Sequence, residues 1–472
     1  MKNIFLIVGL FLSKLAFCQT LTTNLETGIK KIEQDPQFKH AILSMYVVDS
    51  KTGKVVFDKN SNYGLAPASC QKVITSASAF ELLGKEYRYK TYMSLAGEIN
   101  ENGVYRGLIM IKGEGDPSLG SNRYLFSKPN NILGKFSNAL KEYGIKKIDG
   151  IIRFDDVYGT DDMSMPPKGY IWEDMGNYYG ANSWLINWRE NQFDIIFKSG
   201  STNRSTEIKQ IFPIIPNVTF INKVRHGEIG SGDEAYINSS PYATKAYITG
   251  TIPPNKDGFV ISGSMPHPSK VFAEELKNEL KKKSINIDAC NFLSRGEDVM
   301  ESEPRNEFEL TTSKYFSPVF DSLNYWFLKK SVNLYGETFV KTIGQNKTTY
   351  FSLEDGITTI KNLWKQKGVN PSAINIIDGS GLSPANRVTT NALVTVMQYA
   401  KKQNWFSSFY NALPEMNGIK MKDGYISGVR SYTGYIKSKS GNEYTFALIV
   451  NNFDGSPATV REKLWKVLDV MK

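Results

Sequence analysis

The chain has 472 residues, of which 41% are hydrophobic and 22% are charged, so it is long enough for two or three globular domains. Its formal net charge of +10 is compatible with an anionic polymer or envelope surface as partner. No basic run is interleaved with aromatic residues, so nucleic acid is not expected. The three cysteines and three histidines lack zinc-site spacing, and the motifs of Ser-His-Asp hydrolases, dinucleotide sites and phosphate loops are absent. The sequence therefore predicts neither a metal ion nor a cofactor.

Residues 1–18 have the pattern of a cleaved secretory signal. A positively charged start precedes an apolar run over 4–12, and Ala16 and Cys18 are small residues at positions −3 and −1 from the expected cleavage site. The apolar run is too short to span a bilayer. We therefore expect a periplasmic product without a transmembrane anchor. Lipid modification of Cys18 is the alternative, which the bulky Phe17 disfavours.

The first and last segments of the mature chain are expected to share one domain. A helix is predicted over 21–34, followed by strands over 41–48 and 54–58. Near the other end, strands over 430–437 and 444–451 precede a closing amphipathic helix. Each half needs a partner to bury its apolar face, so one antiparallel sheet covered by the terminal helices is the simplest assembly.

Ser69 and Lys72 stand at the start of a predicted helix. Pro67 suits a first helical turn, and apolar residues then recur at helical spacing until Gly84. Residues i and i+3 share a helix face, so the lysine amine can reach the serine hydroxyl. Burial would disfavour the charged amine and allow it to act as a general base for a serine nucleophile. The alternative is an ordinary helix start with a solvated lysine.

A β-rich insertion is predicted over 87–302. Short alternating runs are separated by glycine, asparagine and proline, and two helices are expected, over 132–143 and 269–282. The predicted organisation is therefore a signal peptide (1–18), a first domain part (19–86), the insertion (87–302) and a second domain part (303–472).

Three polar stretches follow the insertion. Ser331-Val332-Asn333 lies between helices predicted over 317–330 and 334–344. Residues 378–383 form a turn-rich loop, which we interpret as an aspartate-braced turn. Lys422-Asp423-Gly424-Tyr425 leads into the last strands, where the glycine would allow close approach of another backbone or a ligand.

Ser69-x-x-Lys72, Ser331-x-Asn333 and Lys422-x-Gly424, in this order, resemble the three motifs of penicillin-recognising serine enzymes. The long insertion between the first two is similar to that of class C low-molecular-mass penicillin-binding proteins, the D-alanyl-D-alanine carboxypeptidase/endopeptidase family. Further phrases, among them GEGDPSL and DGSGLSPANRVT, also resemble this family. The resemblance implies an α+β fold, with an antiparallel sheet covered by helices and β-rich modules nested in the insertion.

The resemblance also implies roles for residues in the motifs. Ser69 would be the acylated nucleophile, Lys72 its base and Ser331 a proton relay to the leaving amine. Asn333 would hold the substrate amide and Lys422 would offer positive charge, while the N–H groups of Ser69 and Tyr425 would form the oxyanion hole. The expected partners are peptidoglycan stem peptides, with β-lactams as possible covalent inhibitors.

Two acidic residues and one turn need separate interpretation. Asp155 or Asp156 could bind the free ammonium of a diaminopimelate side chain, as a similar acidic position is thought to do in the family; the alternative is a solvated turn. Lys51-Thr52-Gly53 matches the family's usual third motif, Lys-Thr-Gly, but it precedes Ser69. We therefore interpret it as a hairpin turn.

Two positions depart from the family pattern. Val332 stands where aspartate is common, and Asp423 stands where threonine or serine would hold the substrate carboxylate. We expect the Asp423 carboxylate to repel that group and so to lower penicillin sensitivity. Without compensation the Coulomb repulsion would be on the order of 4 kcal/mol at ~4 Å and an effective dielectric constant of about 20. Strand alternation places Lys422 on the other face, where it need not neutralise Asp423. Arg430 is a possible partner for this carboxylate.

Other functions remain open from the sequence. A β-lactamase would share the motifs but has no use for so large an insertion. A catalytically weakened peptidoglycan-binding homologue is motivated by Asp423 and Val332, although Ser69 and Lys72 are retained. The balance of carboxypeptidase and endopeptidase activity, and a bond between Cys70 and Cys290, also remain open.

Overall fold

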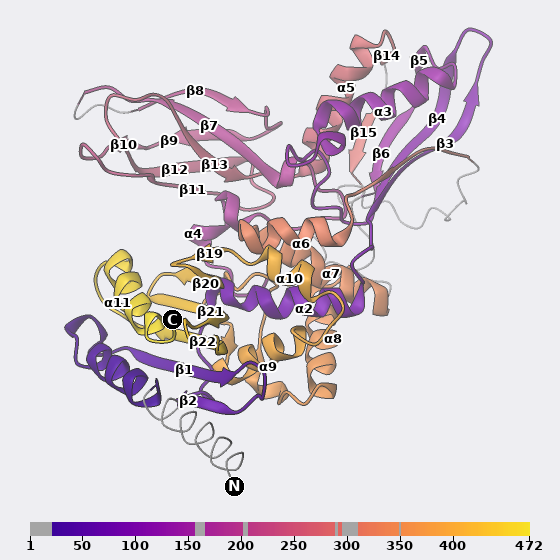
Figure 1. Ribbon diagram of the computed structural model, residues 1–472. Coiled ribbons are helices and arrows are strands. Elements are labelled where there is room, and N and C mark those ends of the chain that lie inside the picture. The colour runs from indigo at the N-terminus through magenta and orange to yellow at the C-terminus, as the bar shows by residue number, and fades with distance from the viewer. Residues whose placement is uncertain (1–20, 156–165, 202–205, 288–290, 295–309, 349–350) are drawn as a thin grey trace. The chain divides into compact units, whose positions relative to one another are not determined.

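The computed structural model describes residues 21–155, 166–201, 206–287, 291–294, 310–348 and 351–472 (Figure 1). The chain forms two compact units, each assembled from separate segments. The first unit comprises Met1–Leu82, Asn324–Ser331 and Ile357–Lys472, and the second comprises Leu83–Leu323 and Val332–Gly356. The predicted signal peptide lies outside the described residues. Within those residues, no helix has the length and apolar character needed to cross a membrane.

A six-stranded antiparallel sheet forms the centre of the first unit. Its strands lie in the order β19-β20-β21-β22-β1-β2. They are β1 (Ile42–Asp49), β2 (Val55–Lys59), β19 (Glu415–Met416), β20 (Ile419–Ile426), β21 (Val429–Lys437) and β22 (Glu443–Asn451). β1 pairs with β22 along its whole length, from Ile42 opposite Asn451 to Asp49 opposite Tyr444. The prediction that the two ends of the chain share one sheet is confirmed.

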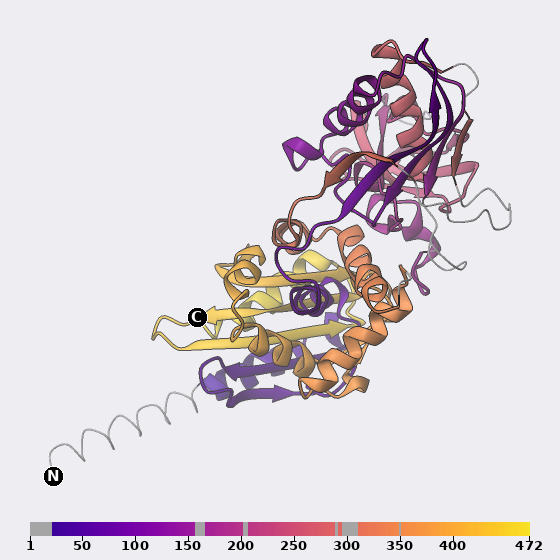
Figure 2. The same cartoon turned by 90° about the vertical axis from the view of Figure 1, so that its right-hand side faces the viewer.

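Helices lie on both faces of this sheet. The helix over 21–33 and α11 (Pro457–Asp469) bury apolar side chains against one face, where Leu25, Leu464 and Phe446 belong to one core. α9 (Thr390–Ala400) packs against β22 and β1, and α2 (Lys72–Leu82) packs against α9 (Figure 2). α10 (Phe406–Ala412) also belongs to this unit, whereas α6 (Phe320–Lys329) and α8 (Leu353–Gln366) each contribute residues to both units. The sheet covered by terminal helices is therefore confirmed.

The second unit contains the predicted β-rich insertion. A mixed sheet consists of β3 (Lys90–Ile99), β4 (Val104–Gly113), β5 (Lys147–Ile148), β6 (Ile151–Asp155), β14 (Asn286–Ile287), β15 (Asn291–Ser294) and β16 (Leu310–Phe316). A three-stranded sheet consists of β7 (Gln192–Lys198), β8 (Glu207–Phe212) and β13 (Asp257–Ser264). A third sheet consists of β9 (Thr219–Asn222), β10 (Arg225–His226), β11 (Glu234–Asn238) and β12 (Lys245–Ile252).

The helices of the second unit pack beside these sheets. α3 (Pro129–Glu142) contacts α5 (Pro268–Lys282), which confirms the two helices predicted inside the insertion. α4 (Trp172–Met175) is a single turn, and α7 (Asn333–Thr348) also belongs to this unit. The second unit thus extends beyond 87–302 on both sides and includes a helix from the predicted second domain part.

Candidate active site

Ser69 lies in a short 3₁₀ turn, η2 (Ala68–Gln71), that leads directly into α2. The side chains at i and i+3 eclipse each other in such a turn, and Lys72 Nζ lies 2.9 Å from Ser69 Oγ. The prediction that the amine reaches the hydroxyl is confirmed. Lys72 is 0% exposed, so the alternative of a solvated lysine is wrong. The predicted helix is present as α2, and its residues 72–80 are all buried.

A distant loop holds the Lys72 amine in place. Nζ donates a hydrogen bond of 2.8 Å to the carbonyl oxygen of Ser380. The paired strands β17 (Ile374–Asn375) and β18 (Arg387–Val388) flank this loop. Asp378 closes it by accepting hydrogen bonds of 2.7 Å from the N–H groups of Gly381 and Ser383. The aspartate-braced turn is confirmed, but its contact with the lysine was not predicted.

Asp378 also connects the loop to the nucleophile turn. Its Oδ1 accepts a hydrogen bond of 3.0 Å from Gln71 Nε2, and its carbonyl oxygen accepts one of 2.6 Å from the same nitrogen. Burial raises the pKa of this carboxyl above its ordinary value, against the opposing effects of its hydrogen bonds and of the Lys72 charge. The loop and the nucleophile turn are therefore joined by buried polar groups, which fixes the position of the Ser380 carbonyl oxygen.

Two glycines allow neighbouring segments to approach Ser69 closely. A side chain at Gly381 would overlap the carbonyl group of Ala68, which itself has a left-handed φ of 45°. A Cβ atom at Gly424 would lie 2.8 Å from Ser69 N and 2.7 Å from Pro67 O. β20 therefore runs directly beside the N–H group of the nucleophile. The left-handed conformation of Ala68 costs on the order of 1–3 kcal/mol, and such conformations of non-glycine residues are often retained at functional sites.

Cys70, next to the nucleophile, is not a competing one. Its side chain is fully buried, and its Sγ donates to the carbonyl oxygen of Lys422 at 3.2 Å. Burial raises the pKa of the thiol to about 12, so the reactive thiolate is not formed at neutral pH. Cys70 is a free thiol, and Cys290 lies outside the described residues.

Asp423 forms an ion pair with Lys422, contrary to the expectation from strand alternation. Lys422 Nζ lies 3.0 Å from Asp423 Oδ1 and 2.7 Å from the Asp423 carbonyl oxygen. Alternation fixes only the direction of Cβ, and the four-carbon side chain of lysine is long enough to turn back toward its neighbour. The predicted unscreened repulsion at Asp423 is therefore wrong.

Arg430, on the adjacent strand β21, also lies near this carboxylate. Its Nη1 is 4.0 Å from Asp423 Oδ2, and its guanidinium carbon lies 4.8 Å from the centre of the Tyr425 ring. Burial raises the pKa of Asp423, but the charge and hydrogen bond of Lys422 and the charge of Arg430 outweigh it, so the pKa is lowered. Among the described residues, Arg430 Nε is buried without a hydrogen-bond partner. Two cations, one in the third motif and one on the adjacent strand, therefore lie beside the Asp423 carboxylate.

The other residues predicted to belong to the active site lie in the second motif and at the end of β6. Ser331 belongs to the first unit and has a left-handed φ of 56°. Asn333 opens α7 in the second unit, where its Nδ2 donates to Tyr179 O at 2.8 Å. Asp155 ends β6 and is buried, so the alternative of a solvated turn is wrong for this residue. Asp156 lies outside the described residues.

Lys51-Thr52-Gly53 forms the turn between β1 and β2, as predicted. Asp49 Oδ1 accepts hydrogen bonds from the N–H groups of Lys51 at 3.1 Å and Thr52 at 2.7 Å. This stretch is therefore a hairpin turn braced by an aspartate.

A serine in contact with a buried lysine, beside a strand of an antiparallel sheet covered by helices, defines a penicillin-recognising serine enzyme. Residues 25–418 match the model of the D-Ala-D-Ala carboxypeptidase 3 (S13) family, and the chain belongs to this family. It is accordingly a serine-type carboxypeptidase of the penicillin-binding class.

Individual relatives agree with this assignment. The D-alanyl-D-alanine carboxypeptidase of Actinomadura sp. (strain R39) is 22% identical over 94% of this chain and 84% of its own. D-alanyl-D-alanine carboxypeptidase DacB of Haemophilus influenzae is 22% identical over 85% of this chain and 83% of its own. The crystal structure of penicillin-binding protein 4 (dacB) from H. influenzae aligns with a TM-score of 0.76 at 18% identity, covering 96% of this chain and 99% of that one. The predicted family and α+β fold are confirmed.

Proposed function

We propose that the protein cleaves D-alanyl-D-alanine or D-alanyl-diaminopimelate bonds of peptidoglycan stem peptides through an acyl-enzyme on Ser69. The observation that carries this proposal is the 2.9 Å separation of Lys72 Nζ and Ser69 Oγ inside a buried site. A neutral amine at this distance can accept the hydroxyl proton as the oxygen attacks the substrate carbonyl. Ser380 O accepts a hydrogen bond from the amine and so orients the nitrogen.

We assign the remaining steps to the other residues of the three motifs. The N–H groups of Ser69 and Tyr425 stabilise the oxyanion, and Gly424 allows β20 to lie directly against the backbone of Ser69. The C–N bond then breaks, and Ser331 relays the proton to the leaving amine. Asn333 holds the substrate amide. Water finally attacks the Ser69 ester and gives one proton to the Lys72 amine. The shortened peptide leaves with the hydroxyl of that water, and Lys72 passes the proton to the departing Ser69 Oγ.

Release of D-alanine tests this function directly. The purified protein should release D-alanine from an N-acetylated peptide that ends in D-Ala-D-Ala, and not from the same peptide ending in L-Ala-L-Ala. A cross-linked muropeptide dimer, incubated in parallel, measures the endopeptidase activity. Failure to cleave either D-substrate would contradict the proposal and favour the weakened homologue that Asp423 suggests. We further propose a periplasmic location after removal of residues 1–18, which amino-terminal sequencing of the secreted protein tests.

Replacing Asp155 and Asp156 together by asparagine should remove the preference for substrates with a free side-chain ammonium. A buried carboxylate attracts an ammonium more strongly than a solvated one does, because water screens it less. The comparison is kcat/KM for a diaminopimelate peptide with its ammonium free or acetylated. If the double variant keeps the wild-type ratio, these residues do not bind the ammonium.

Replacing Asp423 by threonine or asparagine should accelerate acylation by benzylpenicillin about threefold to tenfold. The Lys422 ammonium and Arg430 would then be released to bind the carboxylate of the β-lactam. Asp423 is partly exposed, so water screens its ion pairs and the expected gain is about 1 kcal/mol. Asparagine removes only the charge and serves as the matched control for threonine. If the second-order rate constant of acylation is unchanged or lower in both variants, the ion pairs of Asp423 with Lys422 and Arg430 do not compete with the ligand.

The same ion pair predicts a pH-dependent contribution to stability. The folded-state pKa of Asp423 is lowered, so its contribution is present above the ordinary aspartate pKa and is lost as the pH falls through the lowered value. The melting temperature of wild type should therefore exceed that of Asp423→Asn at neutral pH and approach it in strong acid. A difference that stays constant down to acid unfolding would contradict this assignment.

A further inference from the structure

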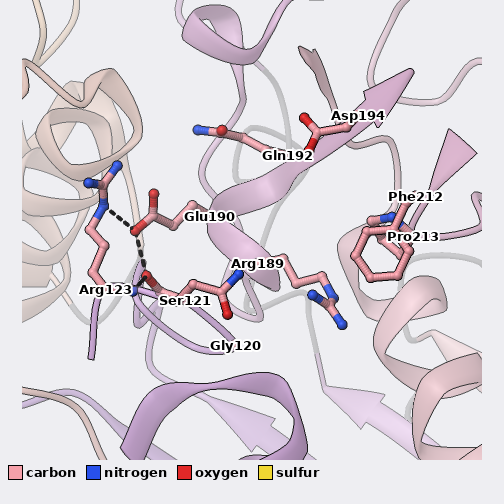
Figure 3. Close-up of a pocket in the computed structure, with 10 residues that line it drawn as sticks. Gly120, Ser121, Arg123, Arg189, Glu190, Gln192, Asp194, Phe212 and Pro213 are labelled. Atoms are coloured by element: carbon pink, nitrogen blue, oxygen red, sulfur yellow. Dashed lines mark hydrogen bonds and ion pairs between the residues drawn. The ribbon is translucent and has the colours of Figure 1, made fainter. Parts of the chain in front are cut away.

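The second unit contains a cavity that the proposed peptidase chemistry does not use. It has a volume of about 360 Å³ and is formed by residues of the 120–123 loop, of 189–194 and of the end of β8 (Figure 3). This volume is at the small end of the range of ligand sites, which fits a single ring-sized group better than an extended peptide. All the residues that line the cavity belong to the second unit.

The backbone is strained where it borders this cavity. Arg189, Glu190 and Asn191 are three consecutive residues with left-handed φ angles of 55°, 56° and 51°. The side chain of Asn191 stabilises this conformation by accepting from Trp188 N at 2.9 Å and donating to Asn182 O at 2.8 Å. Such conformations persist only where the surroundings impose them, and they concentrate at ligand sites.

Glu190 presents a carboxylate oxygen to the cavity. Its Oε1 accepts hydrogen bonds of 2.7 Å from Ser121 Oγ, 2.7 Å from Arg123 Nε and 2.8 Å from Tyr335 Oη. The residue is only 7% exposed, and no described residue donates a hydrogen bond to its Oε2. Because Oε1 is fixed by three donors, Oε2 is held in one direction and is available to a hydrogen-bond donor of a ligand.

Asp194 provides a second acceptor on the same wall. Its Oδ1 accepts a hydrogen bond of 2.6 Å from Ser262 Oγ, and within the described chain its Oδ2 has no donor. Gln192, two residues earlier on β7, also lines the cavity (Figure 3). Residues i and i+2 of a strand point to the same face, so both side chains belong to this wall of the cavity.

Phe212 provides an apolar surface in the cavity, and the Arg189 guanidinium lies beside its ring. Arg189 Nε donates to both oxygens of Glu275, at 3.0 and 3.2 Å. The guanidinium carbon lies 5.1 Å from the centre of the Phe212 ring, so the ion pair fixes the cation beside that ring. Phe212 is 48% exposed, which leaves part of its ring available to a ligand.

The charges and shape of the cavity together indicate the class of ligand. Two arginines and two carboxylates, those of Glu190 and Asp194, line the cavity, and Glu275 neutralises one of the arginines from outside it. This charge balance disfavours a phosphate or another anion. A sugar ring has hydroxyl groups that donate to carboxylates, an acetamide oxygen that accepts from an amide or guanidinium, and an apolar C–H face that packs on an aromatic ring. We propose that this cavity binds one N-acetylated sugar ring of a peptidoglycan glycan strand. The choice of a peptidoglycan strand rests on the proposed function.

Titration with chitotetraose, an oligomer of N-acetylglucosamine, tests this site independently of catalysis. Calorimetry on the full-length Ser69→Ala protein should detect binding, with cellotetraose, which lacks acetamide groups, binding more weakly. Phe212→Ala and Asp194→Asn should each weaken chitotetraose binding about tenfold. Tyr236→Ala removes a half-exposed aromatic residue that does not line the cavity, and should leave binding unchanged.

Several outcomes would overturn the sugar site. These are absence of chitotetraose binding, equal binding to Phe212→Ala and the parent, or displacement of the sugar by N-acetyl-lysine amide, which would identify an ammonium site. Melting temperatures of the variants establish that each is folded. Release of D-alanine by the protein with Ser69 intact is measured separately. Sugar binding without peptidase activity would contradict the proposed function alone, and peptidase activity without sugar binding would contradict this inference alone.

Discussion

Ser69→Ala should lose at least about a thousandfold in kcat/KM for a D-Ala-D-Ala peptide and form no adduct with benzylpenicillin. The hydroxyl removed is the one that lies 2.9 Å from the buried Lys72 amine, and the neighbouring Cys70 thiol cannot replace it because burial raises its pKa to about 12. The measurements are D-alanine release and intact mass after incubation with the β-lactam.

The control for this variant is a measurement of its melting temperature, which shows whether it is folded. Removing one hydroxyl from the 3₁₀ turn leaves the hydrogen bond of Lys72 to Ser380 O in place, so the melting temperature should stay within a few degrees of wild type. If a folded Ser69→Ala protein still forms a stoichiometric adduct, another residue is the nucleophile.

Lys72→Ala should reduce turnover by about a hundredfold to ten-thousandfold, more than Ser331→Ala does. The base acts in both acylation and deacylation, whereas water can partly replace a relay of one proton. Because Lys72 is fully buried, alanine would also leave a cavity, and Lys72→Met is the matched variant that keeps the volume but not the amine.

Comparison of the two lysine variants separates chemistry from packing. Both should lose activity, while Lys72→Met should be the more stable to heat. If Lys72→Met retains near wild-type acylation, the amine is not the base. If Ser331→Ala is the more damaging change, the relay limits the reaction rather than the base.

Local spacing was sufficient to predict the contact between Ser69 and Lys72. Residues three positions apart meet in a helical turn regardless of the rest of the fold. The pairing of β1 with β22 was also predictable, because each terminal segment alone leaves an apolar face exposed. In contrast, the hydrogen bond from Lys72 to Ser380 joins residues more than three hundred positions apart, and no periodicity encodes it.

The sequence was less informative where long side chains or unusual backbone angles decide the geometry. Strand alternation gave the wrong side for Lys422, since it describes Cβ and not the terminal ammonium. The left-handed conformation of Arg189 and Glu190 has no glycine to signal it, and hydrogen bonds of the Asn191 side chain hold it in place. The cavity beside them was therefore visible only in the folded chain.

The central claim is that Ser69 carries the acyl group, and peptide mapping of the trapped enzyme tests it most directly. The protein is incubated with benzylpenicillin, denatured, digested with trypsin and sequenced by tandem mass spectrometry. We predict one adduct, located on Ser69 within the peptide that ends at Lys72. An adduct on any other residue, or a fully unmodified peptide from a protein that releases D-alanine, would contradict the account.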